Sequence, residues 1–492
     1  MAVPKDRLCS RGTGPVTRWD NIAPVPRRHY PAVMRQRILI GLALVLILVG
    51  GLYLYFAQPD EARLSVAAVS GSRPDITPAR AQIWPTIKVP DAVGWKQGEM
   101  PTAAAGLKVN AFASGLDHPR WLYRLPNGDV LVAETNSPPR QGGGITGWVM
   151  NYLLDKGGAG VPSANRITLL RDANGDGVAE VKQTFLTGLN SPFGMALLGP
   201  YLYVANTDAL VRYPFTPGQT RIDAKPETVI KYPGGGFHWA RNVIVAEDGK
   251  TLYLTVGSST NIADNGLDAE KFRANILQVF PDTKTFRVYA AGTRNPNGLA
   301  LEPKTKALWT VVNERDMLGS DSPPDYLSAV EAGDNFGWPW FYWGGYPDHR
   351  VKPENPGLQE YVKRPDYALG PHVAALGLAF ADEARLGAQF ANGAFIGEHG
   401  SWNRLPVSGY RVIYVPFGDN GFPAKGAKAV DLLSGFLDAK GQARGRPVGV
   451  TFDATGSLLV ADDVGNVIWR VSSATPVPAP SPSAAATPKT SR

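Results

Sequence analysis

Cysteine is nearly absent from this chain of 492 residues: the single example, Cys9, precedes the one long apolar run. The large remainder therefore has no disulfide, no thiolate nucleophile and no cysteine-ligated metal. The sequence also has no P-loop and no dinucleotide glycine fingerprint set directly between a strand and a helix. These absences argue against a phosphate-cradling enzyme and a Rossmann-type oxidoreductase, and they leave the large domain to be stabilised by its core.

Outside the N-terminus, positive and negative side chains nearly balance. The formal net charge is +7, but residues 1–37 hold eight basic and two acidic side chains, which account for six of these charges. The rest of the chain is therefore close to neutral. A nucleic-acid partner is not expected, because no basic patch of the required size is left.

A long uncharged run, Ile38 to Ala57, is the main exception to this pattern. Twenty apolar residues match the hydrocarbon thickness of a bilayer, and arginines precede the run while acids follow it. We therefore predict a single transmembrane helix at 38–57 in the plasma membrane, with the N-terminus in the cytoplasm and the large domain outside it. A cleaved signal peptide is the alternative, but the run is longer than its usual apolar region and ends without a small-x-small cleavage site.

Changes in composition along the chain indicate where its other segments begin and end. Residues 1–37 form a basic tail, within which Met34 is a possible true start, and residues 58–100 mix Pro, Ala and charge as a tether that leads into a first strand. Residues 473–492 are rich in Pro, Ala and Ser and are expected to be disordered. One large domain is predicted at 101–472.

A repeat fills this large domain. Each copy has a glycine-containing loop, an apolar strand, a turn and a second strand that often ends in Asn or Asp, and 54 Gly with 42 Pro favour many short strands. Six copies at variable spacing predict an all-β fold, a six-bladed β-propeller whose loop insertions build a site on one face. The copies start at Gly115, Gly188, Gly236, Gly292, Leu376 and Gly445.

Five histidines lie in the large domain, and one stands out. His238, in "PGGGFHWARN", lies between a glycine run and the first strand of a repeat, where a propeller opens to its channel. Arg241 would hold its pKa down and leave a neutral imidazole able to accept a proton. His118 and His372 fit turn or strand-start positions instead, and His349 is expected to be solvated.

Arginines recur at the equivalent loop position of other repeats: Arg294, Arg404, Arg444 and Arg446. Loops at one end of a radial fold bring such charges to a common centre, which suits a polycarboxylate or phosphate ligand. The alternative is that they pair with acids of neighbouring blades, for which Glu398, Asp462 and Asp463 are available.

Two acidic stretches are open to two interpretations each. The stretch Arg171 to Glu180 has Asp172, Asn174 and Asp176 at calcium-loop spacing, but Gln183 replaces the bidentate glutamate, so a plain hairpin turn fits equally well. The stretch from Val311 to Gly345 is predicted as one long insertion after the second strand of the fourth repeat. Its acids and aromatics suit a hard cation beside a flat ring or a sugar, or a packed loop. Those residues are Glu314, Asp316, Asp321, Asp325, Trp338, Trp340, Tyr342 and Trp343.

Several motifs together resemble the PQQ-dependent glucose and sorbosone dehydrogenase family. "GTRNPNGLAL", "GDNFGWP", "GEHGSWNR" and "RGRPVGVTFDATGSLLVADD" are similar to segments of that family, most of all its sorbosone-type branch, and the resemblance covers roughly 106–471. It implies a six-bladed propeller that oxidises an aldose or a sorbosone-like aldehyde with pyrroloquinoline quinone (PQQ) and calcium. The predicted membrane span, rather than the resemblance, indicates a bacterial inner-membrane protein with the catalytic domain on the periplasmic side.

The resemblance assigns roles residue by residue. His238 matches the general base and Arg294 the residue at the reacting quinone carbonyl, with Asn295 beside it. Cofactor contacts are implied for Trp402, Arg404, Arg444 and Arg446, and the calcium carbonyls for Asp316 and Met317. A membrane quinone or a periplasmic acceptor would receive the electrons.

Departures from the family pattern accompany these matches. Phe237 stands where the glucose branch has an aspartate, and "ERDM" replaces its "E-Q-G-P" calcium loop, which puts the metal in doubt. Two other functions remain open at this point: a calcium-dependent lactonase-like hydrolase of similar architecture, and a non-enzymatic anchored propeller that binds glycan or protein.

Overall fold

The computed structural model describes residues 32–56, 58–80, 82, 84–139 and 144–475, and forms two compact units, Met1–Gln58 and Pro59–Arg492. The predicted tails at residues 1–31 and 476–492 lie outside the described residues. In the first unit, α1 (Ala32–Phe56) contains a run, Val33–Tyr55, with a mean hydropathy of 2.6. This helix is long and apolar enough to cross a membrane, and a signal sequence would have the same properties.

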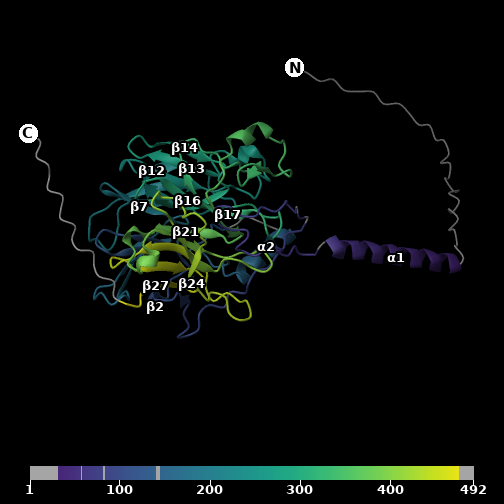
Figure 1. Cartoon of the computed structure of the whole chain (residues 1–492), viewed down its shortest axis with the longest axis horizontal. Helices are drawn as coiled ribbons and strands as arrows, with labels where there is room; N and C mark the ends of the chain where they lie inside the picture. Colours follow the sequence, from purple (N-terminus) through teal and green to yellow (C-terminus); the bar gives the residue numbers. More distant parts are fainter. Residues whose placement is uncertain (1–31, 57, 81, 83, 140–143, 476–492) are drawn as a thin grey trace, which may run out of the picture. The chain divides into compact units, whose positions relative to one another are not determined.

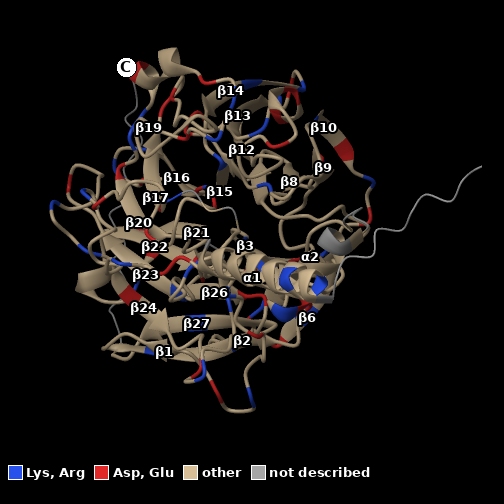
Figure 2. Cartoon of the chain, turned by 90° about the vertical axis from the view of Figure 1, so that its right-hand side faces the viewer, with Lys and Arg blue, Asp and Glu red and all other residues tan. Residues whose placement is uncertain are grey.

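The second unit is a six-bladed β-propeller (Figures 1 and 2). The first blade has strands β3 (Pro119–Arg124), β4 (Val130–Glu134), β5 (Arg166–Arg171) and β6 (Val181–Leu186); the second has β7 (Met195–Leu198), β8 (Tyr201–Ala205), β9 (Ala209–Pro214) and β10 (Glu227–Lys231). The third has β11 (Val243–Val245), β12 (Leu252–Val256), β13 (Asn275–Phe280) and β14 (Thr285–Ala291). The fourth has β15 (Asn295–Leu301), β16 (Leu308–Asn313), β17 (Pro324–Val330) and β20 (Tyr367–Pro371).

The last two blades involve the start of the domain. The fifth has β21 (Ala375–Phe380), β22 (Gly393–Glu398), β23 (Arg411–Pro416) and β24 (Val430–Ser434), with β1 (Thr102–Ala103) at its edge; the sixth has β25 (Pro447–Phe452), β26 (Leu458–Asp462), β27 (Val467–Ser473) and β2 (Leu107–Ser114). Because β2 pairs with β27, an early strand completes the last sheet and closes the ring. A hairpin of β18 (Phe341–Tyr342) and β19 (Tyr346–Pro347) and helix α2 (Gly144–Lys156) lie in loops.

The innermost strands contact one another in a closed ring, in the order β3, β7, β11, β15, β21, β25. Glycines make this close approach possible: a Cβ on Gly298 would lie 2.8 Å from Leu376 O, and one on Gly377 would lie 2.2 Å from Val448 O. The aliphatic side chains between neighbouring blades are buried, as expected for sheets packed face to face. The outer strands β6, β10, β14 and β24 lie at the rim (Figure 2).

The predicted fold is confirmed, since each of the six sequence repeats supplies the two innermost strands of one blade. The prediction of a single insertion after the second strand of the fourth blade is wrong. Its residues Pro324–Val330 form β17, the third strand of the sheet, so the extra chain is divided into a loop at 314–323 and a longer one at 331–366. Most of its acids and aromatics are buried, as in a packed loop.

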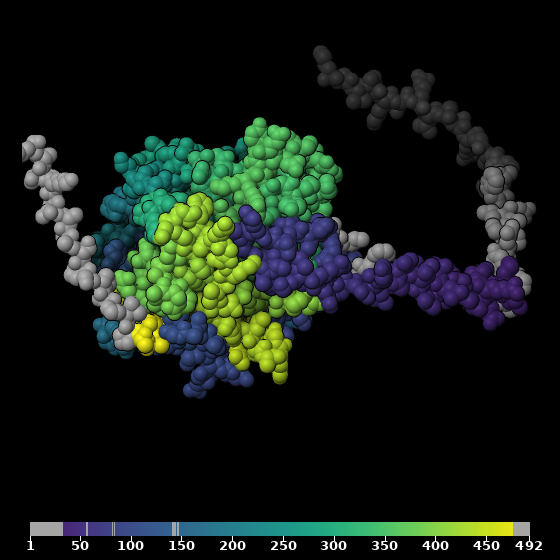
Figure 3. Space-filling model, viewed as in Figure 1, coloured from purple at the N-terminus to yellow at the C-terminus, as the bar shows by residue number. Residues whose placement is uncertain are grey.

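The residues before β1 lie against the propeller. We call residues 59–93 the leading segment; it was predicted as part of a tether. Its backbone hydrogen-bonds along one face, from Ala62 N to Leu405 O, Arg80 N to Leu318 O, Lys88 N to Trp402 O and Val93 N to Ala443 O. Figure 3 shows this dark violet-blue stretch packed beside green residues of the fourth and fifth blades. Its irregular backbone is satisfied by loops distant in sequence, which composition does not reveal.

Candidate functional site

One end of the propeller gathers the candidate residues. Loops that lead into the innermost strands carry His238, Arg294 and Arg446, and loops between second and third strands carry Asp316 and Trp402. In an antiparallel blade these two kinds of loop lie at the same end. The leading segment crosses this same face, because it bonds to Trp402 O, Leu318 O and Ala443 O.

The His238 imidazole has a defined tautomer. Its Nδ1 lies 2.9 Å from both the carbonyl oxygen and the Oγ of Ser258, and Ser258 Oγ donates its one hydrogen to Thr260 O at 2.7 Å. Since both Ser258 oxygens can then only accept, Nδ1 carries the proton and Nε2 keeps its lone pair. No described residue hydrogen-bonds to Nε2. The half-buried ring is thus arranged as a proton acceptor.

The pKa of His238 lies well below its usual 6.5, first because of burial and next because of the Arg294 charge. Arg241, the residue predicted to have this effect, contributes less; its Nη1 donates to His238 O at 2.7 Å and fixes the backbone of the loop. The imidazole is therefore neutral at neutral pH, as a general base requires.

Arg294 is buried beside this histidine. Its Nη1 donates to Glu314 O at 2.6 Å, and its Nη2 donates to Asn261 Oδ1 at 3.0 Å and Asp316 Oδ2 at 2.8 Å. The second Nη1 hydrogen has only Asn313 O, at 3.5 Å, as a described acceptor. The bond to Asn313 O is therefore the weakest that this cation makes, and its Nη1 hydrogen is the one most readily given to a negatively charged oxygen.

Asn295 and His238 are brought together by Gly257 at the end of β12. A Cβ at position 257 would lie 2.5 Å from Asn295 Oδ1 and 2.7 Å from His238 Cβ, so only glycine fits between them. This close approach joins the third and fourth blades at the predicted base.

Asp316 is the centre of a second group of contacts. Its Oδ2 pairs with Arg294, and its Oδ1 accepts from Asn403 Nδ2 at 2.6 Å. Asn403 also donates to His372 Nδ1 at 3.3 Å, while His372 Nε2 donates to Gly319 O at 3.0 Å. Both ring nitrogens of His372 are occupied, which excludes it as a base.

The arginines predicted to bind the cofactor differ in how many of their N–H groups already have a described partner. Arg446 donates to His399 O, Gly400 O and, at 3.4 Å, Gly157 O, and so keeps two of its five N–H groups. Arg404 is buried and donates to Ser320 O and Pro406 O. Arg444 Nε lies 3.7 Å from Glu99 Oε2, in the residues before β1, and the Arg444 guanidinium lies over the ring of Trp95. Trp402 is 37% exposed.

These arginines do not pair with Glu398, which bonds Arg411, and the guanidinium of Arg446 contacts carbonyls rather than acids. The Arg446 backbone N–H donates to Asp462 Oδ1 at 2.8 Å, and Arg404 has only a 4.0 Å contact with Asp321. The chemistry of this donor set fits an anionic, planar group: a partly free Arg446, an Arg294 N–H held only by a 3.5 Å bond, and an exposed indole.

A buried cluster that the sequence did not reveal surrounds Asp463. Its Oδ2 lies 2.5 Å from Arg120 Nη1, 2.8 Å from His399 Nε2 and 3.4 Å from His118 Nε2. Burial lowers the pKa of His118 to about 4, and burial with the Arg446 charge lowers that of His399 to about 3; the Arg120 charge lowers both pKa values further. Both histidines are therefore neutral and structural at neutral pH.

This cluster predicts a measurable pH effect. His399 binds a proton in the unfolded chain near pH 6.5 but in the folded chain only near pH 3, so unfolding is favoured progressively as the pH falls through this window. We expect the wild type to lose more thermal stability between pH 7 and pH 5 than the His399→Gln variant. Thermal unfolding followed by circular dichroism measures this, with exposed His349→Gln as a control that keeps the wild-type difference. Equal losses in wild type and His399→Gln would contradict the assignment.

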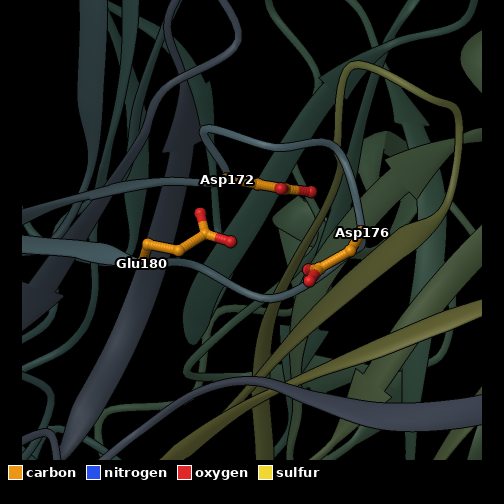
Figure 4. Close-up of side chains that lie close together, drawn as sticks. All are labelled: Asp172, Asp176 and Glu180. Carbon is orange, nitrogen blue, oxygen red and sulfur yellow. The ribbon is translucent and has the colours of Figure 1, made fainter.

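The acidic loop of the first blade forms a compact carboxylate group. One oxygen each of Asp172, Asp176 and Glu180 lies within 4.8 Å of the others (Figure 4). Asp172 also accepts from Gly175 N and Gly177 N, and Glu180 from Ala173 N, as in a hairpin turn. Both interpretations of this loop, calcium site and plain turn, remain predictions.

Comparisons with known proteins place this chain. The TrAA12-like family model matches residues 101–326 and 351–474. The PQQ-dependent pyranose dehydrogenase of Coprinopsis cinerea is 23% identical over 429 residues, covering 75% of this chain and 54% of that protein. An uncharacterised protein of Borreliella burgdorferi is 30% identical over 235 residues, which are 48% of this chain and 60% of that protein. The chain thus spans little more than half the length of these curated relatives.

Solved structures agree on the fold. The AA12 enzyme of Trichoderma reesei superposes with a TM-score of 0.61 at 19% identity, over 79% of this chain and 99% of that one. The PQQ domain of the Coprinopsis pyranose dehydrogenase superposes with a TM-score of 0.60 at 19% identity, over 78% of this chain and all of that one. The predicted relationship to PQQ-dependent sugar dehydrogenases is confirmed. The six-bladed propeller described here belongs to the TrAA12-like family.

Proposed function

We propose that this protein is a PQQ-dependent dehydrogenase that oxidises a sugar or sugar aldehyde, with His238 as the general base. The observation that carries the proposal is the imidazole of His238: Nδ1 is committed to two acceptor oxygens of Ser258, and the lone pair of Nε2 is free. The PQQ-dependent pyranose dehydrogenase of Coprinopsis cinerea, whose name states oxidation of a sugar, supports it.

In this proposal each residue of the site has a separate role. His238 Nε2 takes the proton of the substrate hydroxyl, and burial keeps the ring neutral for that role. The guanidinium of Arg294 would stabilise an oxygen on which negative charge develops, through the N–H now held only by Asn313 O. Arg446 and Arg444 supply cations for the carboxylates of PQQ, and Trp402 supplies an apolar surface for its ring. PQQ, when bound, would supply the hydride-accepting chemistry.

The described site does not favour the hydrolase that was considered from the sequence. A calcium-dependent lactonase needs side-chain carboxylates that are free to bind a metal in the channel. Here Asp316 is paired with Arg294, and Asp463 with Arg120. Both candidate carboxylates are thus already neutralised by arginines.

Helix α1 supports a membrane location within this proposal. Its apolar run of 23 residues is long enough to anchor the protein in the bacterial inner membrane, with the propeller on the periplasmic side. Electrons would then pass to membrane quinone or to a periplasmic acceptor.

The proposal is tested by cofactor uptake. We expect the detergent-solubilised full chain to bind PQQ with a stoichiometry of one, followed by the quinone absorption after gel filtration. Arg446→Gln should weaken uptake on the order of tenfold or more, because a charge-assisted contact to a carboxylate is lost. Arg221→Gln, on an exposed arginine paired only with Asp223, is the control and should bind normally. Absence of uptake by the wild type would contradict the proposed function.

A further inference from the structure

Two backbone carbonyls at the site, those of Asp316 and Met317, have no acceptor position left. Asp316 O accepts from Asn261 Nδ2 at 3.1 Å and from Arg350 Nη1 at 3.1 Å. Met317 O accepts from Gln82 N at 3.2 Å and from the same Arg350 Nη1 at 3.2 Å. A carbonyl oxygen has two lone pairs, so two donors saturate each of them. These are the carbonyls that the sequence resemblance assigned to calcium.

Arg350 is held firmly in this position. Its Nε and Nη2 donate to the two oxygens of Asp348 at 2.8 and 2.7 Å, a fork-to-fork pairing that fixes the guanidinium plane. Asp348 is buried and is also 3.3 Å from Nη1 of the fully buried Arg315. The nearby arginine charges lower the pKa of Asp348, so the carboxylate stays ionised and keeps holding Arg350.

The charge around these carbonyls is already balanced. Asp316, whose carboxylate lies nearest to them in the chain, pairs with Arg294 at 2.8 Å, and Asp348 pairs with Arg350. Calcium takes six to eight oxygen ligands, usually with carboxylates among them. At this position it would meet two saturated carbonyls and a guanidinium cation that repels it.

Two of the three donors that saturate the carbonyls come from residues outside the family match, and the third, Asn261, lies within it. Gln82 lies in the leading segment, before the matched residues begin at 101, and Arg350 lies in the unmatched stretch 327–350. Arg350 thus donates to both oxygens and Gln82 to Met317 O, each from residues that the family model does not match.

We infer that Arg350 takes the place of the divalent cation at Asp316 O and Met317 O, so that this protein binds its quinone without calcium at that position. Arg350 supplies one fixed positive charge there, while Asn261 completes the saturation of Asp316 O and Gln82 that of Met317 O. The identity of the ligand in this inference rests on the proposed function, whereas the exclusion of calcium from this position does not.

Quinone uptake with and without calcium tests this inference. In the Asp176→Ala background, which disables the acidic loop of the first blade, we expect PQQ binding by the full chain to be the same in excess EDTA and in millimolar calcium. Arg350→Ala frees one acceptor position on each carbonyl, so its uptake should be weaker in EDTA and should recover about tenfold on addition of calcium. Arg364→Ala is the matched control, because Arg364 bonds Ser72 O and contacts neither carbonyl.

The outcomes separate the two proposals. Uptake by the Asp176→Ala protein only in calcium would overturn the inference and leave the proposed function standing. No uptake under either condition would overturn the proposed function. Equilibrium dialysis with radioactive calcium then tests the inference alone: no retained ion in Asp176→Ala protein is expected, and one tightly retained ion per chain would overturn it. This measurement needs no substitution at Arg350 and is unaffected if that variant fails to fold.

Discussion

Changing His238 to Ala is expected to lower turnover by about 10²- to 10⁴-fold, while PQQ uptake stays close to that of the wild type. The loss follows from the arrangement of the ring, since Nε2 is the nitrogen left free to accept the substrate proton. Steady-state kinetics with an artificial electron acceptor, beside quinone uptake by absorption, measures both effects.

The control for this variant is His349→Ala, because the side chain of His349 is 75% exposed and lies outside the site. Its turnover should equal that of the wild type. The pH profile gives a second check: since burial and Arg294 depress the pKa of His238, turnover of the wild type should be insensitive to protonation of this residue until the pH is well below 6.5. Full turnover in His238→Ala would remove His238 from the mechanism.

Changing Arg294 to Ala is expected to lower kcat by on the order of 10²-fold or more, because the guanidinium that would stabilise a developing negative charge is lost. The same change leaves the carboxylate of Asp316 without its cation, which costs on the order of 3 kcal/mol of stability where a largely buried pair is broken. Kinetics and thermal unfolding therefore should both respond.

A double variant separates these two effects. In Arg294→Ala/Asp316→Asn the unpaired charge is gone, so we expect much of the stability to return while kcat stays low. Recovery of kcat together with stability would show that Arg294 only neutralises Asp316. Asp316→Asn alone should retain most of the turnover, because its amide keeps an oxygen for Arg294.

The fold was largely predictable because the repeat is local. Four of the six copies place a glycine where two innermost strands approach, as at Gly298 and Gly377, several end the second strand in Asn or Asp, and these features recur at visible spacing. His238 and Arg294 could be singled out for the same reason, since both occupy the loop before an innermost strand. The third strand of the fourth blade, Pro324–Val330, was missed because acids and prolines flank it like loop residues.

The surroundings of the site could not be predicted, because they depend on contacts between distant segments. Asn261 bonds Arg294 and Asp316, and Arg350 reaches carbonyls more than thirty residues earlier in the chain. The leading segment had no periodicity to indicate a strand, yet its backbone is fixed by the loops it crosses. Such pairings leave no pattern in one sequence, since each donor and acceptor is an ordinary loop residue by itself.

The central claim, that this propeller oxidises sugars through bound PQQ, is tested most directly in a single turnover. The full chain is loaded with PQQ, freed of excess cofactor and mixed rapidly with aldoses or sorbosone in the absence of any electron acceptor, while the quinone absorption is followed. The account predicts that one equivalent of quinone is reduced by at least one of these sugars, and that reduction is slowed in His238→Ala with the cofactor still bound. Bound quinone that stays oxidised with every sugar, in protein that is folded and fully loaded, would contradict it.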